Sequence, residues 1–267
     1  MQSKSLFVFL SALALSSASP LRRRCSSNDT IPAPAPTPTN STTTPPAAAV
    51  PVLPTTGSGT QLAGPDDATL KHILVGHGIQ NYTCSAAGAT PASIGALAVL
   101  WEITDLYPGT SPSSLSPADF SALTSKVLRT TAMPLNMAAD SAGADAASPF
   151  PAPVDLTVDG LGAPVRFLGH HFFDSANTPT FDLGGAGDGE LFKGKKDAGI
   201  PAPADADRGE DPATGAVDWL RLSDKGGAST GVRLVYRVLT AGGNPEPCAG
   251  AGVNQSVPYT AQYWIFA

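Results

Sequence analysis

Apolar and polar residues alternate along several short stretches of the chain, and these stretches predict β-strands. They are rich in β-branched and aromatic residues and are separated by clusters of Gly, Pro and Asp. We expect a mainly β fold, either an antiparallel barrel or a sandwich with one or two short helices, because these folds bury one face of every strand. The clearest strand-like stretches are residues 79–84, 165–173, 217–222, 232–240 and 259–266.

One segment has helical periodicity instead. Ser116 is a suitable N-cap and Pro117 suits the first helical position. After this cap, apolar residues recur at helical spacing over about three turns, at Phe120, Leu123, Val127 and Leu128.

Two other segments are less regular. Residues 96–106 fit either a strand or a short helix, and residues 131–153 are typical of a surface loop.

The first residues are typical of an export signal. Lys4 precedes an apolar run of about ten residues, followed by small residues, so we expect a signal peptide over residues 1–18. A membrane-spanning helix needs roughly twenty apolar residues, so we expect no membrane span. The sequence therefore predicts a secreted, extracellular protein.

Residues 19–58 are dominated by Pro, Thr, Ser and Ala, which cannot bury enough apolar surface to fold. We expect a disordered, O-glycosylated stalk. The three arginines at 22–24 fit either a processing site or a solvated basic cluster, and trimming there would free Cys25 at a new N-terminus. Residues 59–267 are long enough for a single β-rich domain.

The formal net charge is −6 at pH 7. Removal of the leader and the basic cluster would make the chain more acidic still. Because an acidic surface repels phosphate backbones, we expect no nucleic-acid partner.

An oxidising compartment favours a disulfide between Cys84 and Cys248, which bracket most of the patterned sequence, and leaves Cys25 as the odd cysteine. Acceptor sequons for N-glycosylation are consistent with export. They occur at Asn28, Asn40, Asn81 and Asn254.

The histidines offer one possible metal site. In a strand, only one of His170 and His171 faces the interior, where it could meet His77 across the sheet. Structural histidines are the preferred interpretation, because a metal needs three converging ligands and the spacing does not require them to converge. Glu102, Asp174 or Asp182 is the candidate third ligand of such a site. Because convergence is not required, we expect no metal and no cofactor.

The Gly-x-Ser-x-Gly pattern at residues 227–231 resembles the nucleophile motif of hydrolases. That motif needs a preceding strand and a following helix, whereas a strand-like segment follows here. We interpret residues 227–231 as a hairpin turn.

Four blocks of the sequence stand out together: residues 78–84 (GIQNYTC), 169–173 (GHHFF), 235–243 (VYRVLTAGG) and 257–264 (VPYTAQYW). They resemble the domain of unknown function 3455 family, found in secreted fungal and some bacterial proteins. The family has no established activity, so the resemblance implies none. Fungal relatives often carry the name malate dehydrogenase, but the strand, glycine-rich turn and helix of a nicotinamide site are absent from this sequence, and we expect no such activity.

Two classes of function follow. The first is a noncatalytic extracellular binding or interaction module, with cell-wall glycan or a host or surface protein as partner. The alternative is a secreted hydrolase or small-ligand enzyme whose polar pocket at the barrel mouth is lined by Gln80, His171 and Arg237. The first class would use aromatic stacking surfaces, although aromatics at strand spacing are more often core residues. The candidates are Tyr82, Trp101, Trp219, Tyr236 and Trp264.

Overall fold

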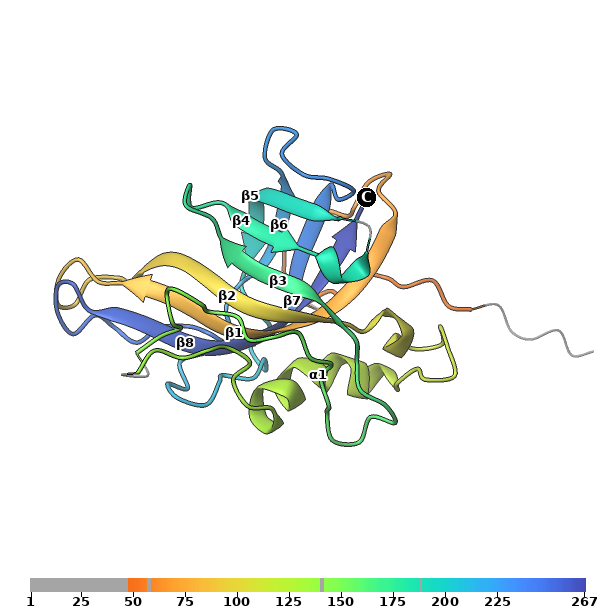
Figure 1. Ribbon diagram of the computed structural model, residues 1–267, viewed down its shortest axis with the longest axis horizontal. Helices are drawn as coiled ribbons and strands as arrows, with labels where there is room; N and C mark the ends of the chain where they lie inside the picture. The colour runs from red at the N-terminus through yellow and green to blue at the C-terminus, as the bar shows by residue number, and fades with distance from the viewer. Residues whose placement is uncertain (1–47, 57–58, 140–141, 188) are drawn as a thin grey trace, which may run out of the picture. The chain divides into compact units, whose positions relative to one another are not determined.

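The computed structural model describes residues 48–56, 59–139, 142–187 and 189–267. In these residues eight antiparallel strands form a closed barrel: each strand pairs with the next, and β8 closes onto β1 (Figure 1). The barrel, one of the two predicted architectures, is confirmed. The strands are β1 (Leu70–Thr83), β2 (Ala92–Glu102), β3 (Phe167–Phe173), β4 (Pro179–Asp182), β5 (Leu191–Ile200), β6 (Trp219–Asp224), β7 (Leu234–Gly242) and β8 (Asn254–Phe266).

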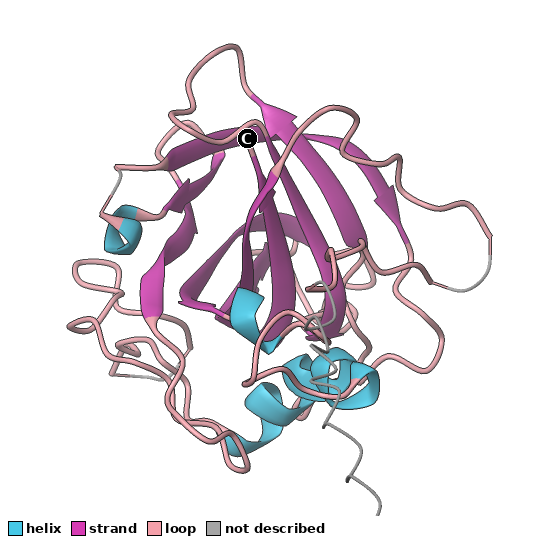
Figure 2. Ribbon diagram, turned by 90° about the vertical axis from the view of Figure 1, so that its right-hand side faces the viewer, coloured by secondary structure: helices cyan, strands magenta, loops and turns pink. Residues whose placement is uncertain are grey.

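The predicted helix is also confirmed, as α1 (Pro117–Thr130). The Ser116 hydroxyl accepts a hydrogen bond of 3.1 Å from the backbone N–H of Asp119 and so caps the first turn. The helix lies outside the barrel, against β1, β7 and β8 (Figures 1 and 2). Two 3₁₀ turns, η1 (Thr104–Leu106) and η2 (Gly184–Ala186), follow strands β2 and β4.

Both faces of the barrel wall are buried. Inward side chains such as Leu74, Phe181 and Tyr263 fill the interior. Outward side chains such as Trp101 and Trp264 pack beneath α1 and the connecting loops. The fold therefore has two apolar cores separated by one sheet, whereas the alternation in the sequence predicts burial of only one face of each strand.

The backbones of neighbouring strands approach very closely in places. A Cβ atom at Gly78 of β1 would lie 1.9 Å from the carbonyl oxygen of Leu97 on β2. On the inward face, a Cβ at Gly76 would lie 2.6 Å from the ring of Tyr263. Glycine at these two positions lets β1 pass close to its neighbours and leaves room for an aromatic ring inside the barrel.

The disulfide between Cys84 and Cys248 is confirmed, with Cα atoms 5.5 Å apart and 164 residues of sequence between them. Cys84 follows the end of β1, and its backbone N–H donates to the carbonyl of Val253. The bond therefore braces the region where β1 ends and β8 begins.

Residues 48–56 lie within the segment expected to be disordered, yet they pack on the barrel. Leu53 packs against the outer core, and the N–H of Val52 donates to the Tyr107 hydroxyl at 3.1 Å. The physical reason is the apolar side chain of Leu53, which gains free energy by leaving water, whereas Val50 and Val52 stay exposed. The expected signal peptide, the tribasic cluster, Cys25, Asn28 and Asn40 lie outside the described residues.

No helix among the described residues is long and apolar enough to span a membrane.

Candidate functional site

A cavity of about 410 Å³ occupies one end of the barrel interior. Odd-numbered strands end there and even-numbered strands begin there, because the sheet is antiparallel throughout. The three residues predicted to line a barrel-mouth pocket, Gln80, His171 and Arg237, all line this cavity. The remaining lining residues are Tyr82, Ser93, Phe173, Pro179, Phe181, Lys196, Val217, Asp218, Leu220, Leu222, Asn244 and Tyr263.

Strand alternation brings the three polar residues to one place. Gln80 comes from β1, His171 from β3 and Arg237 from β7. The neighbours of Arg237, Tyr236 and Val238, belong to the outer core, so Arg237 lies on the opposite face of its strand, as the sequence predicts.

Gln80 is the least satisfied polar residue of the cavity wall. Its side chain is only 5% exposed, and its Nε2 atom is buried without a hydrogen-bond partner among the described residues. The amide lies near enough to the Tyr259 hydroxyl to lower its pKa slightly, against the much larger rise caused by burial. Burial of an unpaired amide is costly, so a ligand oxygen that accepts from Nε2 would stabilise the structure.

His171 is held in one orientation by its neighbours. Nδ1 lies 2.9 Å from the carbonyl oxygen of Thr180, and the ring stacks on Phe181 with centroids 4.1 Å apart. Burial, with a smaller contribution from the charge of Arg237, lowers the pKa of His171 to about 4, although the hydrogen bond to the Thr180 carbonyl acts in the opposite direction. The ring is therefore neutral near pH 7. Since a carbonyl only accepts, Nδ1 carries the hydrogen and Nε2 keeps its lone pair.

Arg237 brings positive charge to the cavity. Its Nε and Nη2 donate to the backbone carbonyl of Asp218 at 3.1 and 2.9 Å, rather than to a carboxylate. The same charge opposes the burial-driven rise in the pKa of Tyr263. Lys196, which is exposed, adds a second cation to the lining, and the carboxylate of Asp218 is the one acid there.

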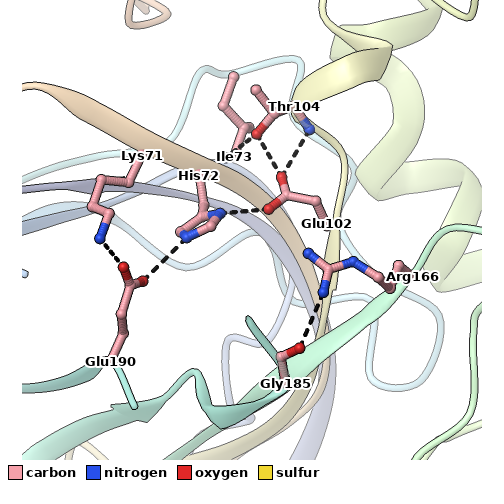
Figure 3. Close-up of polar contacts among 8 residues, drawn as sticks. All are labelled: Lys71, His72, Ile73, Glu102, Thr104, Arg166, Gly185 and Glu190. Carbon is pink, nitrogen blue, oxygen red and sulfur yellow. Dashed lines mark hydrogen bonds and ion pairs between the residues drawn. The ribbon is translucent and has the colours of Figure 1, made fainter. Parts of the chain in front are cut away.

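The opposite end of the barrel holds a network of charged side chains (Figure 3). His72 lies between two carboxylates, with Nδ1 2.5 Å from Oε2 of Glu102 and Nε2 3.1 Å from Oε2 of Glu190. Glu190 is 2% exposed and also pairs with Lys71. The backbone N–H of Thr104 donates to the other oxygen of Glu102 at 3.0 Å. This network closes the second end of the barrel with paired charges.

No local sequence motif predicts this network. His72 is separated from its two partners by 30 and 118 residues. Of the three positions, the sequence singles out only Glu102, and as a possible metal ligand rather than as a partner of His72.

The histidine pair considered for a metal is not assembled. His77 points to the outer face of β1, where Nδ1 lies 3.1 Å from the carbonyl oxygen of Tyr259. His171 faces the interior, while His170 packs outside against Phe150 with ring centroids 4.0 Å apart. Strand alternation thus places His77 and His171 on opposite faces of the sheet. Across the described ranges, no group of three His, Cys, Asp or Glu residues could hold a metal ion.

The five candidate aromatics are buried, as strand spacing favours, and form no exposed stacking surface. Trp101, Trp219, Tyr236 and Trp264 are each at most 1% exposed, and they pack in the outer core. Loops and α1 cover the face on which these four rings lie, so the rings contribute packing energy instead of a glycan platform. Tyr82 lines the interior cavity, is 8% exposed and donates its hydroxyl hydrogen to the carbonyl of Gly243.

Residues 227–231 form part of the connection between β6 and β7, as predicted for a hairpin turn. The N–H of Ser229 donates to the Asp224 carboxylate at 2.9 Å, and its hydroxyl accepts from the N–H of Lys193 at 2.9 Å. Ser229 therefore has a structural role in holding this turn.

Two of the four sequons lie in the described residues. Asn254 is exposed at the first position of β8. Asn81 is half-buried within β1, and its side-chain oxygen accepts from the Ser256 hydroxyl at 2.8 Å.

A second cavity, of about 340 Å³, lies outside the barrel between residues 51–55 and 61–65 on one side and the outer face of the sheet on the other. Its walls are mainly apolar, including Leu53, Ile200 and Phe266. It lacks the convergent polar groups of the interior cavity, so the barrel mouth is the stronger candidate site.

Comparison with curated proteins finds no match, and comparison with solved structures finds none either. The model of one family, described as a protein of unknown function (DUF3455), matches residues 65–267, a range that covers all eight strands and both ends of the barrel. The chain therefore belongs to the DUF3455 family.

Proposed function

We propose that this chain is a noncatalytic extracellular binding module that takes a small ligand into the mouth of its barrel. The observation that carries the proposal is the buried Nε2 of Gln80, an atom of a cavity-lining residue that has no hydrogen-bond partner among the described residues. Buried polar groups in proteins are nearly always paired, so an unpaired amide in a cavity favours a bound ligand as its partner.

The size and lining of the cavity support this proposal. A volume of about 410 Å³ falls within the range of small-molecule sites, roughly 300–1,000 Å³. Apolar side chains such as Phe181 and Leu222 form much of the wall, and a few polar groups converge on it. A rigid barrel holds these groups in place, which lowers the entropic cost of binding.

The cavity supports binding better than catalysis. With a pKa of about 4, His171 is a weak base near neutral pH, whereas a general base works best with a pKa close to the working pH. No hydrogen bond joins its Nε2 to a hydroxyl or thiol in the described part of the chain. The enzyme alternative therefore has a pocket but no activated nucleophile within these residues.

The extracellular setting forms part of the proposal. It is supported by the sequence of the leader, the Cys84–Cys248 disulfide and the exposed sequon at Asn254. The proposed module can bind a small ligand in the barrel mouth and also contact a cell wall or a host surface with another part of its surface.

The test blocks the cavity and leaves the fold intact. Ser93 lines the cavity and is exposed, so Ser93→Trp should fill the mouth, whereas Ile94→Trp, at the next position and 47% exposed, should not. We expect fragments detected by ligand-observed NMR with the full chain to lose binding in Ser93→Trp and keep it in Ile94→Trp. If a broad fragment library yields no fragment whose binding depends on the cavity, the proposal is overturned.

A further inference from the structure

We propose that the ligand of the barrel mouth is a small carboxylic acid with an apolar body, whose carboxylate lies at Arg237 and Lys196 and whose body lies against Phe181 and Leu222. This inference rests on the proposed function and names the chemical class that the site would take.

The charged residues of the cavity indicate that the ligand is an anion. Two cations, Arg237 and Lys196, line it against the single carboxylate of Asp218. The guanidinium of Arg237 bonds only to the backbone carbonyl of Asp218, through Nε and Nη2. Within the described residues no carboxylate pairs with Arg237, and its Nη1 atom has no hydrogen-bond partner there, so Nη1 can donate to a ligand oxygen. An anion is the natural complement of this charge.

The position of Arg237 strengthens the argument. Its charge reaches the side chains of the cavity wall, because it acts on His171, Tyr82 and Tyr263. An interior cavity wall has a lower effective dielectric than bulk water, so an ion pair formed there is stronger than one on an open surface.

The apolar residues of the lining indicate that the ligand also has an apolar body. The apolar part of the cavity wall consists of Phe173, Phe181, Val217, Leu220 and Leu222. These side chains offer no hydrogen bond to an ionic or sugar-like ligand. They favour an aromatic ring or a short alkyl group, which gains free energy by leaving water. A bare inorganic anion would leave this wall unused.

Gln80 and His171 add orientation. Nε2 of Gln80 is a buried donor, and Nε2 of His171 keeps its lone pair while Nδ1 donates to Thr180. A ligand oxygen can accept from Gln80, and a hydroxyl on the ligand can also donate to His171. Gln80 lies on β1, which is separated from β7 and Arg237 only by β8. His171 lies on β3, on the other side of the barrel from β7.

The experiment is isothermal titration calorimetry of the full chain with two acids and their neutral counterparts. Benzoate and octanoate are the acids, benzamide and octanol are the uncharged probes, and inorganic phosphate is the anion without an apolar body. We expect each acid to bind at least tenfold more tightly than its neutral counterpart and than phosphate.

Matched variants locate the charge. Arg237→Gln and Lys196→Gln should each weaken benzoate binding by roughly tenfold or more, the size expected for a charge-assisted hydrogen bond. Lys195→Gln, at the exposed neighbouring position outside the cavity, should leave it unchanged, as should Arg233→Gln on the outer surface. Unchanged benzamide binding shows that Arg237→Gln is folded, and the exposed Lys196→Gln tests the charge independently.

The failures are distinguishable. If neutral probes bind as tightly as acids and Ser93→Trp abolishes both, the ligand class is overturned and the binding site stands. If phosphate binds as tightly as benzoate, the apolar half of the proposal is overturned. If no probe binds in a manner sensitive to Ser93→Trp, the binding function itself loses support.

Discussion

The Nδ1 atom of His171 lies 2.9 Å from the carbonyl oxygen of Thr180 on the neighbouring strand, and this contact holds a neutral imidazole inside the barrel. Burial sets its pKa at about 4, against an ordinary value of 6.5. Between these values the unfolded chain binds a proton that the folded chain does not. Stability is therefore complete above pH 6.5 and falls as the pH drops through this window toward 4.

We predict that His171 contributes a loss of up to about 3 kcal/mol in unfolding free energy between pH 7 and pH 4. Urea denaturation at both pH values measures it, and His171→Phe should remove this share. Buried His77 and half-buried His170 also have lowered pKa values, so a smaller dependence of the same sign should persist in the variant. An equal pH dependence in both proteins would contradict the assignment.

The Cys84–Cys248 disulfide should contribute substantially to stability. A closed loop of 164 residues corresponds to about 5 kcal/mol in the loop-entropy model, and measured contributions are typically about 2–4 kcal/mol. The double substitution Cys84→Ser with Cys248→Ser should lower the unfolding free energy by about 2–4 kcal/mol in urea denaturation. Peptide mapping without reduction gives an independent check, since two free thiols at these positions in the native protein would refute the bond.

Gly78 should tolerate no side chain. A Cβ there would lie 1.9 Å from the Leu97 carbonyl oxygen, which belongs to the backbone and cannot move without disturbing the β1–β2 ladder. Gly78→Ala should therefore destabilise the barrel by about 3 kcal/mol or prevent folding. Gly162→Ala is the control, because no atom lies within 4 Å of its added Cβ. Equal melting temperatures for the two variants would show that β1 passes β2 at a greater distance.

The charged network at the closed end should be strongly coupled. His72→Leu removes a partner from two carboxylates, one of them the buried Glu190, and should cost about 3 kcal/mol. Adding Glu190→Gln should recover part of this loss, with a coupling energy above about 1 kcal/mol in a double-mutant cycle. The exposed pair Arg233 and Asp67 is the comparison and should show little coupling. Additive effects of His72→Leu and Glu190→Gln would contradict a direct interaction.

The sequence predicts β3, β6, β7, β8 and the end of β1, because β-branched and aromatic residues are frequent in these segments. The sequence leaves residues 96–106, which include most of β2, open between a strand and a short helix. It does not predict β5 (Leu191–Ile200), which contains three lysines and two glycines, or the four-residue β4 (Pro179–Asp182). Both strands depend on their neighbours in the closed sheet more than on their own composition. Local pattern therefore fails where pairing partners impose the conformation.

The site was partly predictable for a related reason. Gln80, His171 and Arg237 are polar residues within apolar strands, so their presence in sequence marks inward positions with a possible role. Lys196 and Ser93 carry no such signal, since one lies among other lysines and the other near a strand end. Only the register of the closed sheet brings them to the same cavity.

The ladder between β1 and β8 has a consequence for how the barrel folds. It joins Leu70 to Phe266 and Thr83 to Asn254, so the first strand must wait for the last before its second edge is paired. Until then β1 and β7 each present a free edge, the kind of surface on which chains aggregate. Such long-range closure slows folding. A nascent chain that lacks β8 therefore has seven strands but two unpaired edges, and it stays open to aggregation until β8 is synthesised and pairs with both.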